Sequence, residues 1–214
     1  MAYKRGIRLI APLAVAGFAF ALSFGVLARA AGMGAFAPIA MSATTFGGSA
    51  QFAAVSVLHD GGGAVTAVVA AVLLNLRYLP IGISIASGFA GGAARRLLES
   101  QLVVDESWAV SVGGGGFDRR VLVGAGGLLY VCWVGGTALG VVGGSALGDP
   151  NRFGLDAAFP ALFLALVAPR LRERRALYAA LLGGALAVAL IPVAPPGIPI
   201  VAASAACLVD WRRG

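Results

Sequence analysis

The sequence predicts an all-α, polytopic inner-membrane protein, built as two tandem repeats of about four long and short transmembrane segments with broken helices. Of its 214 residues, 59% are hydrophobic and only 12% are charged, and the mean hydropathy is +0.91. A soluble fold of this length needs more polar surface. The apolar stretches are too long, and alternate too weakly, to be strands of an outer-membrane barrel. The 32 glycines are typical of membrane helices whose backbones pack closely.

An internal repeat organises the apolar segments. Aligning the chain with itself at an offset of 115 positions gives these matches: Lys4-Arg5 with Arg119-Arg120, Gly25-Val26 with Gly140-Val141, and 80–85 with 195–200. Together they indicate two halves of similar plan within one membrane domain. We expect repeat one at about 4–96, a cytoplasmic connector at about 97–118, and repeat two at about 119–213.

Each half contains four apolar segments. In the first half they are 9–31, 35–58, 63–78 and 80–93, and in the second 121–147, 153–169, 176–192 and 197–211. A helix needs about 20 residues to cross a bilayer. The third and fourth segments are therefore short, and we expect them to be helices of a broken hairpin. The first apolar run is longer than a typical signal-peptide core, which predicts an uncleaved first helix.

The basic residues predict the topology. The net charge is +7, but the arginines and lysines lie in short groups between apolar segments, which indicates topology signals and no nucleic-acid partner. With a cytoplasmic N-terminus and four crossings in each half, every group lies inside: Lys4/Arg5/Arg8, Arg95/Arg96, Arg119/Arg120, Arg170/Arg172/Arg174/Arg175 and Arg212/Arg213. An odd number of crossings in the first half would place Arg95/Arg96 or Arg119/Arg120 on the outer side of the membrane. A parallel repeat is therefore favoured over an inverted one.

The segment between the halves carries acidic residues and a glycine run. Residues 94–118 include Asp105, Glu106 and four glycines at 113–116. A phosphate-binding loop would need a preceding strand, a following helix and a nearby lysine, and the sequence has none of these. We expect a flexible connector, of which residues 102–112 could dip into the edge of the bilayer.

Polar residues interrupt the second apolar segment. Four hydroxyl residues recur at offsets of three, four and seven: Ser42, Thr45, Ser49 and Ser56. They share a face if one helix continues, and either line a cavity or bond back to their own helix. Gly47 and Gly48 weaken that helix, and Gln51 projects away from the hydroxyl face. A segment with polar side chains on two sides is expected to be surrounded by protein, or to have an interrupted helical backbone.

Arg77 is the most informative residue of the chain. It lies within an apolar stretch, where an ionised guanidinium is costly unless it has a function. Asn75 precedes it by two residues, so the two side chains diverge on a regular helix. Pro80 removes a backbone donor and disfavours helix at the preceding residue. A helix break between Asn75 and Pro80 is therefore predicted, as in transporter binding sites. The alternative is an Arg77 that only holds the fold.

Three carboxylates are candidate partners for Arg77, for a substrate amine or for a proton. Asp156 opens the second segment of the second half, where it also suits a helix cap. Asp105 and Glu106 lie in the connector, where they also suit a solvated face. Cys132 and Cys207 fall in apolar segments and predict neither a disulfide nor a metal site. No cofactor is expected.

The order of several motifs resembles the AzlC family, the large subunit of branched-chain amino acid exporters. The motifs are Phe24-Gly25, Met41-Ser42, GGSAQF at 47–52, NLRYLPIGIS at 75–84, Asp105-Glu106-Ser107 and GLDAAFPALFLAL at 154–166. The resemblance covers nearly the whole chain. It implies export of leucine, isoleucine, valine and sometimes methionine across the bacterial or archaeal inner membrane, with a small hydrophobic AzlD-type partner subunit.

A zwitterionic amino acid suits these residues. Arg77, or amides freed near Gly47 and Gly48, would meet its carboxylate. Neutral polar contacts would come from Gln51, Asn75, Ser42 and Ser49. The sequence has no nucleotide-binding motif, so we expect secondary transport and no enzymatic activity.

Other functions remain as alternatives. Ser49 and His59 could form the nucleophile and base of an intramembrane protease, but ten residues separate them and a fold-back would be needed. A scaffold or assembly subunit of a transport complex is a second alternative. An exporter of another small zwitterionic compound is a third.

Overall fold

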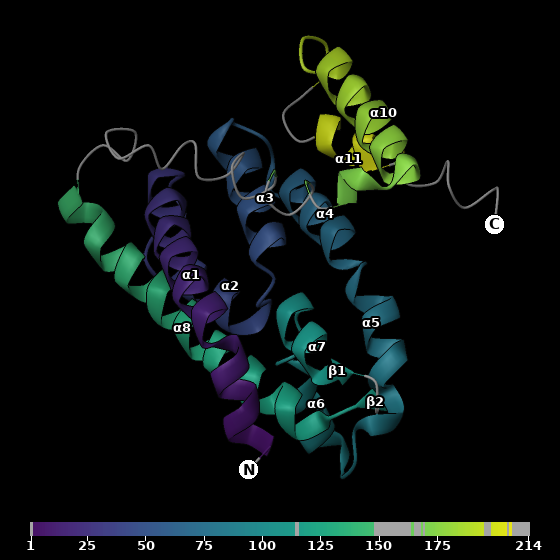
Figure 1. Cartoon of the computed structure of the whole chain (residues 1–214). Helices are drawn as coiled ribbons and strands as arrows, with labels where there is room; N and C mark the ends of the chain where they lie inside the picture. Colours follow the sequence, from purple (N-terminus) through teal and green to yellow (C-terminus); the bar gives the residue numbers. More distant parts are fainter. Residues whose placement is uncertain are drawn as a thin grey trace.

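The computed structural model describes residues 2–113, 116–147, 164, 168, 170–194, 198–204 and 206. Over these residues the chain is almost wholly helical, and the predicted all-α membrane class is confirmed (Figure 1). Among the described residues, three helical stretches are long and apolar enough to cross a membrane: Ala2–Ala30, Ala64–Gly88 and Arg119–Gly144. Most of the predicted segment 153–169, including Asp156, lies outside the described residues, as does Cys207.

Two 29-residue helices, α1 (Ala2–Ala30) and α8 (Arg119–Leu147), lie side by side and run in the same direction (Figure 1). Glycines allow their backbones to touch. A Cβ on Gly25 would collide with the carbonyl oxygen of Thr137, and one on Gly140 with that of Leu22. Leu22 and Gly25 lie 115 positions before Thr137 and Gly140, the offset of the repeat seen in the sequence, and the repeat itself stays a prediction. Small residues at such crossings are typical of closely packed membrane helices.

The second predicted segment is two helices, α2 (Phe36–Thr44) and α3 (Gly48–His59). Phe46, between them, has a φ of 42°, in the left-handed region that non-glycine residues rarely adopt. Met33, before α2, packs near the end of α1, whereas Gly48 meets Trp133 at the middle of α8. The chain therefore enters to mid-depth and turns back, because neither helix is long enough to cross.

The third long stretch is α4 (Ala64–Asn75), α5 (Tyr78–Ile85) and the short 3-10 helix η1 (Ala86–Gly88). It is interrupted at Leu76 and Arg77, within the predicted break. Pro80 has no N–H to bond the carbonyl of Leu76, which accepts from the Leu79 N–H at 3.0 Å instead. This tighter turn offsets α5 from α4.

The expected connector is folded. It contains α6 (Ala93–Ser100), α7 (Asp105–Ser111) and a two-stranded antiparallel hairpin of β1 (Val112–Gly113) and β2 (Gly116–Phe117), with Val112 opposite Phe117. The Gln101 side chain donates 2.8 Å to the carbonyl of Thr44, at the end of α2. The Asp118 N–H donates to Ser111 near the start of α8. A second helix pair therefore reaches mid-depth from the opposite end and contacts the first.

The described C-terminal part comprises the 3-10 helix η3 (Arg170–Arg172), α10 (Arg174–Leu190) and α11 (Ile198–Ser204). Helix α11 packs against α10 and contacts α4. Helix α10 ends at Leu190, which is 115 residues after the last residue of α4, Asn75.

The crossing count differs from the sequence expectation, which gave the first half four crossings. The structure has two candidate spans there, α1 and α4–η1, because the second segment turns back at Gly47 and Gly48. Two crossings, like four, return the chain to the side of the membrane on which it began. The basic groups at Lys4, Arg95 and Arg119 therefore still share one side if these spans cross.

Candidate functional site

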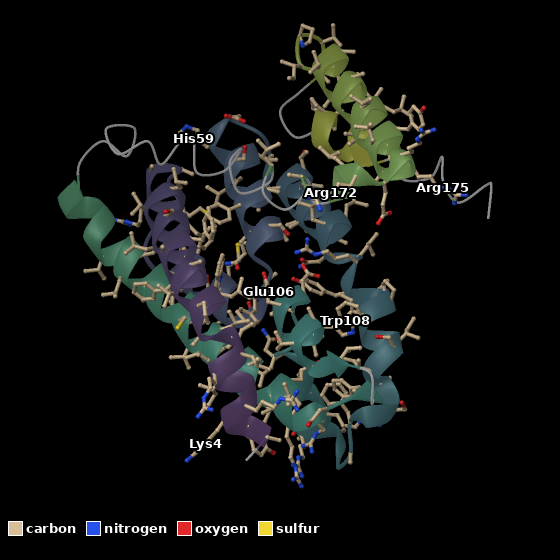
Figure 2. All side chains as sticks on the ribbon, in the orientation of Figure 1. Lys4, His59, Glu106, Trp108, Arg172 and Arg175 are labelled. Carbon is tan, nitrogen blue, oxygen red and sulfur yellow. The ribbon has the colours of Figure 1, made fainter. Side chains whose placement is uncertain are left out.

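A cavity of about 280 Å³ lies where the helix breaks meet. Its lining comprises Leu13, Ala16, Gly17, Phe20, Phe46, Gly48, Ser49, Arg77, Tyr78, Val104, Asp105, Glu106, Leu129 and Trp133. Figure 2 shows Glu106 midway between Lys4, at one end of the molecule, and His59 at the other. The cavity is therefore at mid-depth, and its walls are apolar except at one polar edge.

Arg77 forms the centre of that polar edge. One terminal nitrogen, Nη2, lies 3.0 Å from Oδ2 of Asp105 and donates to Oγ of Ser49 at 2.8 Å. It also reaches the Tyr78 hydroxyl at 3.3 Å, and the guanidinium carbon lies 5.2 Å from the centre of the Tyr78 ring. The Nε of Arg77 is buried and has no hydrogen-bond partner among the residues that the structure describes. The guanidinium is therefore held in place with donor capacity left over.

The start of α3 adds further donors at the same edge. Its N-cap, Gly47, provides no side chain to bond the first amides, which have no carbonyl partner within the helix. A helix N-terminus of this kind favours a negatively charged ligand. A Cβ on Gly47 would meet the side-chain amide of Asn75, whose buried Oδ1 has no partner within the described part of the chain. Because Gly47 has no side chain, the break before α3 packs directly against the break after α4.

Two adjacent carboxylates face Arg77 from the first turn of α7. Asp105 is its ion-pair partner, whereas no basic side chain in the described part of the chain lies within ion-pair distance of Glu106. Burial raises the pKa of the Glu106 carboxyl above its usual value; the neighbouring Asp105 adds to this rise, and the Arg77 guanidinium partly opposes it. Helix α7 lies outside the candidate membrane spans. We name Ser49, Arg77, Tyr78, Asp105 and Glu106 the open site.

A second polar cluster, the closed network, lies on the other side of α3. The Trp133 indole N–H donates to Oε1 of Gln51 at 2.8 Å, and Nε2 of Gln51 donates to Oγ of Ser42 at 2.8 Å. The Thr137 hydroxyl donates to the Trp133 carbonyl, so Ser42 is the donor in the 2.8 Å bond to Thr137. The chain of bonds begins and ends on Trp133. Ser42, Gln51 and Thr137 are fully buried.

The predicted site residues therefore separate into groups. The structure brings Arg77, Ser49, Gly48, Asp105 and Glu106 to the cavity, with Asn75 and Gly47 behind it. It places Ser42 and Gln51 in the closed network instead. The common hydroxyl face assumed one continuous helix, and the turn at Phe46 sends Ser42 and Ser49 to different neighbours.

Several lining residues were missed by sequence reasoning. Phe46, Tyr78 and Trp133 have aromatic rings at the cavity, and Leu13 to Phe20 supply one apolar face. Tyr78 follows Arg77 directly, which was a usable signal. Trp133 has no distinguishing neighbour in the sequence, and only the packing of α8 on α3 shows its place.

The protease alternative does not fit the geometry. Ser49 and His59 lie at opposite ends of α3, about 15 Å apart at the rise of an α-helix, and His59 is exposed. No fold-back brings the two together. Within the described ranges, no three His, Cys, Asp or Glu side chains form a group that could hold a metal ion.

Fold and cavity together define a polytopic helical membrane protein with a polar site enclosed at breaks in its helices. The family model described as AzlC protein matches residues 12–147, a range that includes every residue lining the cavity. The chain belongs to the AzlC family.

Two curated proteins are similar to the chain over most of its length. The chain is 32% identical over 213 residues to an Archaeoglobus fulgidus protein described as an uncharacterized membrane protein, covering 98% of this chain and 94% of the relative. It is 30% identical over 183 residues to the branched-chain amino acid transport protein AzlC of Bacillus subtilis, covering 81% and 70%. No solved structure matches the chain.

Proposed function

We propose that the chain is the large subunit of a secondary exporter of branched-chain amino acids, leucine, isoleucine, valine and in some cases methionine. It acts in the prokaryotic cytoplasmic membrane, with its N-terminus cytoplasmic and with a small hydrophobic AzlD-type partner. The observation that carries the proposal is the cavity, in which cationic, anionic and apolar surfaces meet at mid-depth. The name of the Bacillus subtilis relative supports the cargo class.

Each part of an amino acid has a chemically suitable surface. The substrate carboxylate suits the Arg77 guanidinium and the first amides of α3. Its ammonium group suits the Asp105 and Glu106 carboxylates of α7, at the same polar edge. Its branched side chain suits the apolar wall of α1 and α8, which includes Phe20 and Leu129. A cavity near 280 Å³ lies at the small end of the usual range for ligand sites, which favours a small substrate.

The arrangement of the helix breaks suits alternating access. Two helix pairs, α2–α3 and α6–α7, reach mid-depth from opposite ends and meet beside the cavity. A substrate held there is separated from each side by only one pair. Small movements of either pair would therefore open one side, as in transporters whose broken helices surround a central site.

An export assay tests the proposal. Cells expressing the chain together with the candidate small subunit are loaded with an isoleucine-containing dipeptide, and released and intracellular isoleucine are measured. We expect faster release and lower accumulation than in cells lacking the pair. Equal accumulation with and without the pair would contradict the proposal.

The same assay separates a transporter from a scaffold. Arg77→Ala should leave a normally inserted complex that fails to export. A scaffold subunit would instead lose abundance and partner association with the same substitution. Collapsing the ion gradients should abolish export, whereas ATP-dependent export without gradients would contradict secondary transport.

A further inference from the structure

Glu106 is an ionisable group at the cavity that has no ion-pair partner of its own among the described residues, and Arg77 acts on it only from beyond ion-pair distance. Arg77 and Asp105 neutralise each other at 3.0 Å, and no other basic side chain in the described part of the molecule reaches the cavity. An ionised Glu106 would therefore lack a cation of its own at ion-pair distance. Apolar surroundings penalise such a charge, so the empty cavity favours the protonated acid.

The surroundings of Glu106 contain few groups that could titrate in its place. Helices α1 and α8 present only non-titratable side chains to the cavity: Leu13, Ala16, Gly17, Phe20, Leu129 and Trp133. Helix α3 presents Ser49. The break between α4 and α5 presents Arg77 and Tyr78, and Asp105 is the neighbour of Glu106 on α7. Asp105 is paired, which leaves Glu106 as the acid whose charge depends on the cavity's contents.

We propose that Glu106 exchanges its proton for the ammonium group of the substrate, so that binding of one amino acid releases one proton. The inference rests on the proposed function and deepens it. The protonated acid and the zwitterionic substrate become a carboxylate paired with the substrate ammonium, plus one free proton. No other bond forms or breaks. The bound substrate keeps both of its charges, and its carboxylate shares Arg77 with Asp105.

This competition couples export to proton entry. On the cytoplasmic side the substrate displaces the proton, which returns to the cytoplasm. On the outer side the substrate leaves and Glu106 takes up a proton, because an unpaired carboxylate is again unfavourable. The cavity then returns protonated. One amino acid moves out for each proton that moves in, which is antiport driven by the proton gradient.

The wild-type protein provides the first test. The full chain, purified with its candidate small subunit, is titrated with isoleucine in weakly buffered detergent solution containing a pH-sensitive dye. Below the pKa of Glu106 we expect release approaching one proton per isoleucine bound. By linkage, affinity should rise about tenfold per pH unit as pH increases towards that pKa, and then level off. Working below about pH 7 keeps the substrate's own amino group protonated throughout.

Glu106→Gln provides the second test, with Asp60→Asn as the matched control. Asp60 lies at the exposed end of α3, so its substitution makes the same chemical change away from the cavity. We expect Glu106→Gln to bind isoleucine more weakly, with no proton release and no dependence on pH. Asp60→Asn should behave as the wild type.

The outcomes separate the two proposals. Isoleucine binding without proton release in the wild type would overturn the exchange at Glu106 and leave the exporter assignment standing. Retained proton release in Glu106→Gln would overturn it as well, because another group would be titrating. Absence of any binding of isoleucine, leucine, valine or methionine would overturn the proposed function and, with it, this inference. If Glu106→Gln does not fold, the wild-type titration alone decides.

Discussion

The open site and the closed network occupy two sides of the same helix, α3, at the same depth, and they differ in how their polar groups are paired. In the closed network each hydroxyl and amide passes a hydrogen bond to the next, from the Trp133 indole back to the Trp133 carbonyl. In the open site, among the described residues, Arg77 Nε has no hydrogen-bond partner and Glu106 has no ion-pair partner.

The difference indicates two uses of polarity inside a membrane domain. Buried polar groups that pair with one another join helices, and here they tie α2, α3 and α8 together. Buried polar groups that stay incompletely paired beside a cavity are costly for the fold, and are kept where a ligand completes them. Substitutions in the two clusters should therefore have separable effects, on stability in one and on binding in the other.

Arg77→Ala should have the largest effect, and the effect should be on binding. Losing the cation that faces the substrate carboxylate should weaken isoleucine affinity about 100-fold, the order expected when one partner of a hydrogen-bonded charge pair with a ligand is removed. Abundance in the membrane should change little, since the Arg77 side chain is 36% exposed and such pairs add little stability. Binding titration and membrane quantification measure the two quantities.

Arg77→Lys is the control for this prediction. It keeps the charge but loses the forked donor geometry, so its affinity should fall between the wild type and Arg77→Ala. A parallel loss of abundance and binding in both variants would show that Arg77 holds the fold.

Gln51→Leu should have the next largest effect, and this effect should be on stability. The substitution leaves the buried Trp133 indole N–H without its acceptor and removes the donor to Ser42, whose hydroxyl keeps only its bond to Thr137. We expect a loss of about 1–3 kcal/mol in the free energy of unfolding, seen as a lower melting temperature in detergent. Isoleucine affinity of the folded fraction should stay within about twofold. A large loss of affinity at unchanged stability would place Gln51 in the binding site.

Trp133→Phe tests the residue that borders both clusters. Phenylalanine retains an aromatic wall for the cavity and a ring beside Phe52, but it removes the donor to Gln51. The expected cost is about 1 kcal/mol of stability, with affinity close to that of the wild type. The same thermal and binding measurements apply, and an effect on affinity alone would contradict the division between the clusters.

Ser49→Ala should have the smallest effect. It removes one neutral acceptor of Arg77 and leaves the ion pair with Asp105 in place. Affinity should fall about threefold to tenfold, as for the loss of one hydrogen bond of about 1 kcal/mol. Ser84→Ala, at an exposed serine that bonds only its own helix, is the matched control and should have no effect. Equal results for the two variants would remove Ser49 from the site.

Much of the fold was predictable because its signals are local. Composition and segment length predicted a helical membrane protein, and the paired glycines and Pro80 predicted where helices break. Backbone geometry at such positions depends mainly on the residues themselves. The turn at Gly47 and Gly48 nevertheless reverses the chain, whereas a crossing helix was expected, because the direction after a break is set by packing against α1 and α8.

For the site, the sequence predicted candidate residues but not how they pair. Arg77 stood out because lipid excludes charge, but three carboxylates were equally acceptable partners in the sequence. Asp105 is the partner seen, since the α6–α7 pair brings α7 to the middle of α8. Asp156 lies outside the described residues. Ser42 and Gln51 were expected beside the substrate, yet both are paired in the closed network.

By itself the sequence determined that the chain enters a bilayer, where its helices are interrupted, and that one arginine needs a partner. These follow from transfer free energies and backbone dihedrals, which belong to single residues and their neighbours. Tertiary structure alone decided which polar groups meet. Hydrogen bonds and ion pairs require atoms within about 3 Å, and residues 28 or 82 positions apart reach that distance only through helix docking.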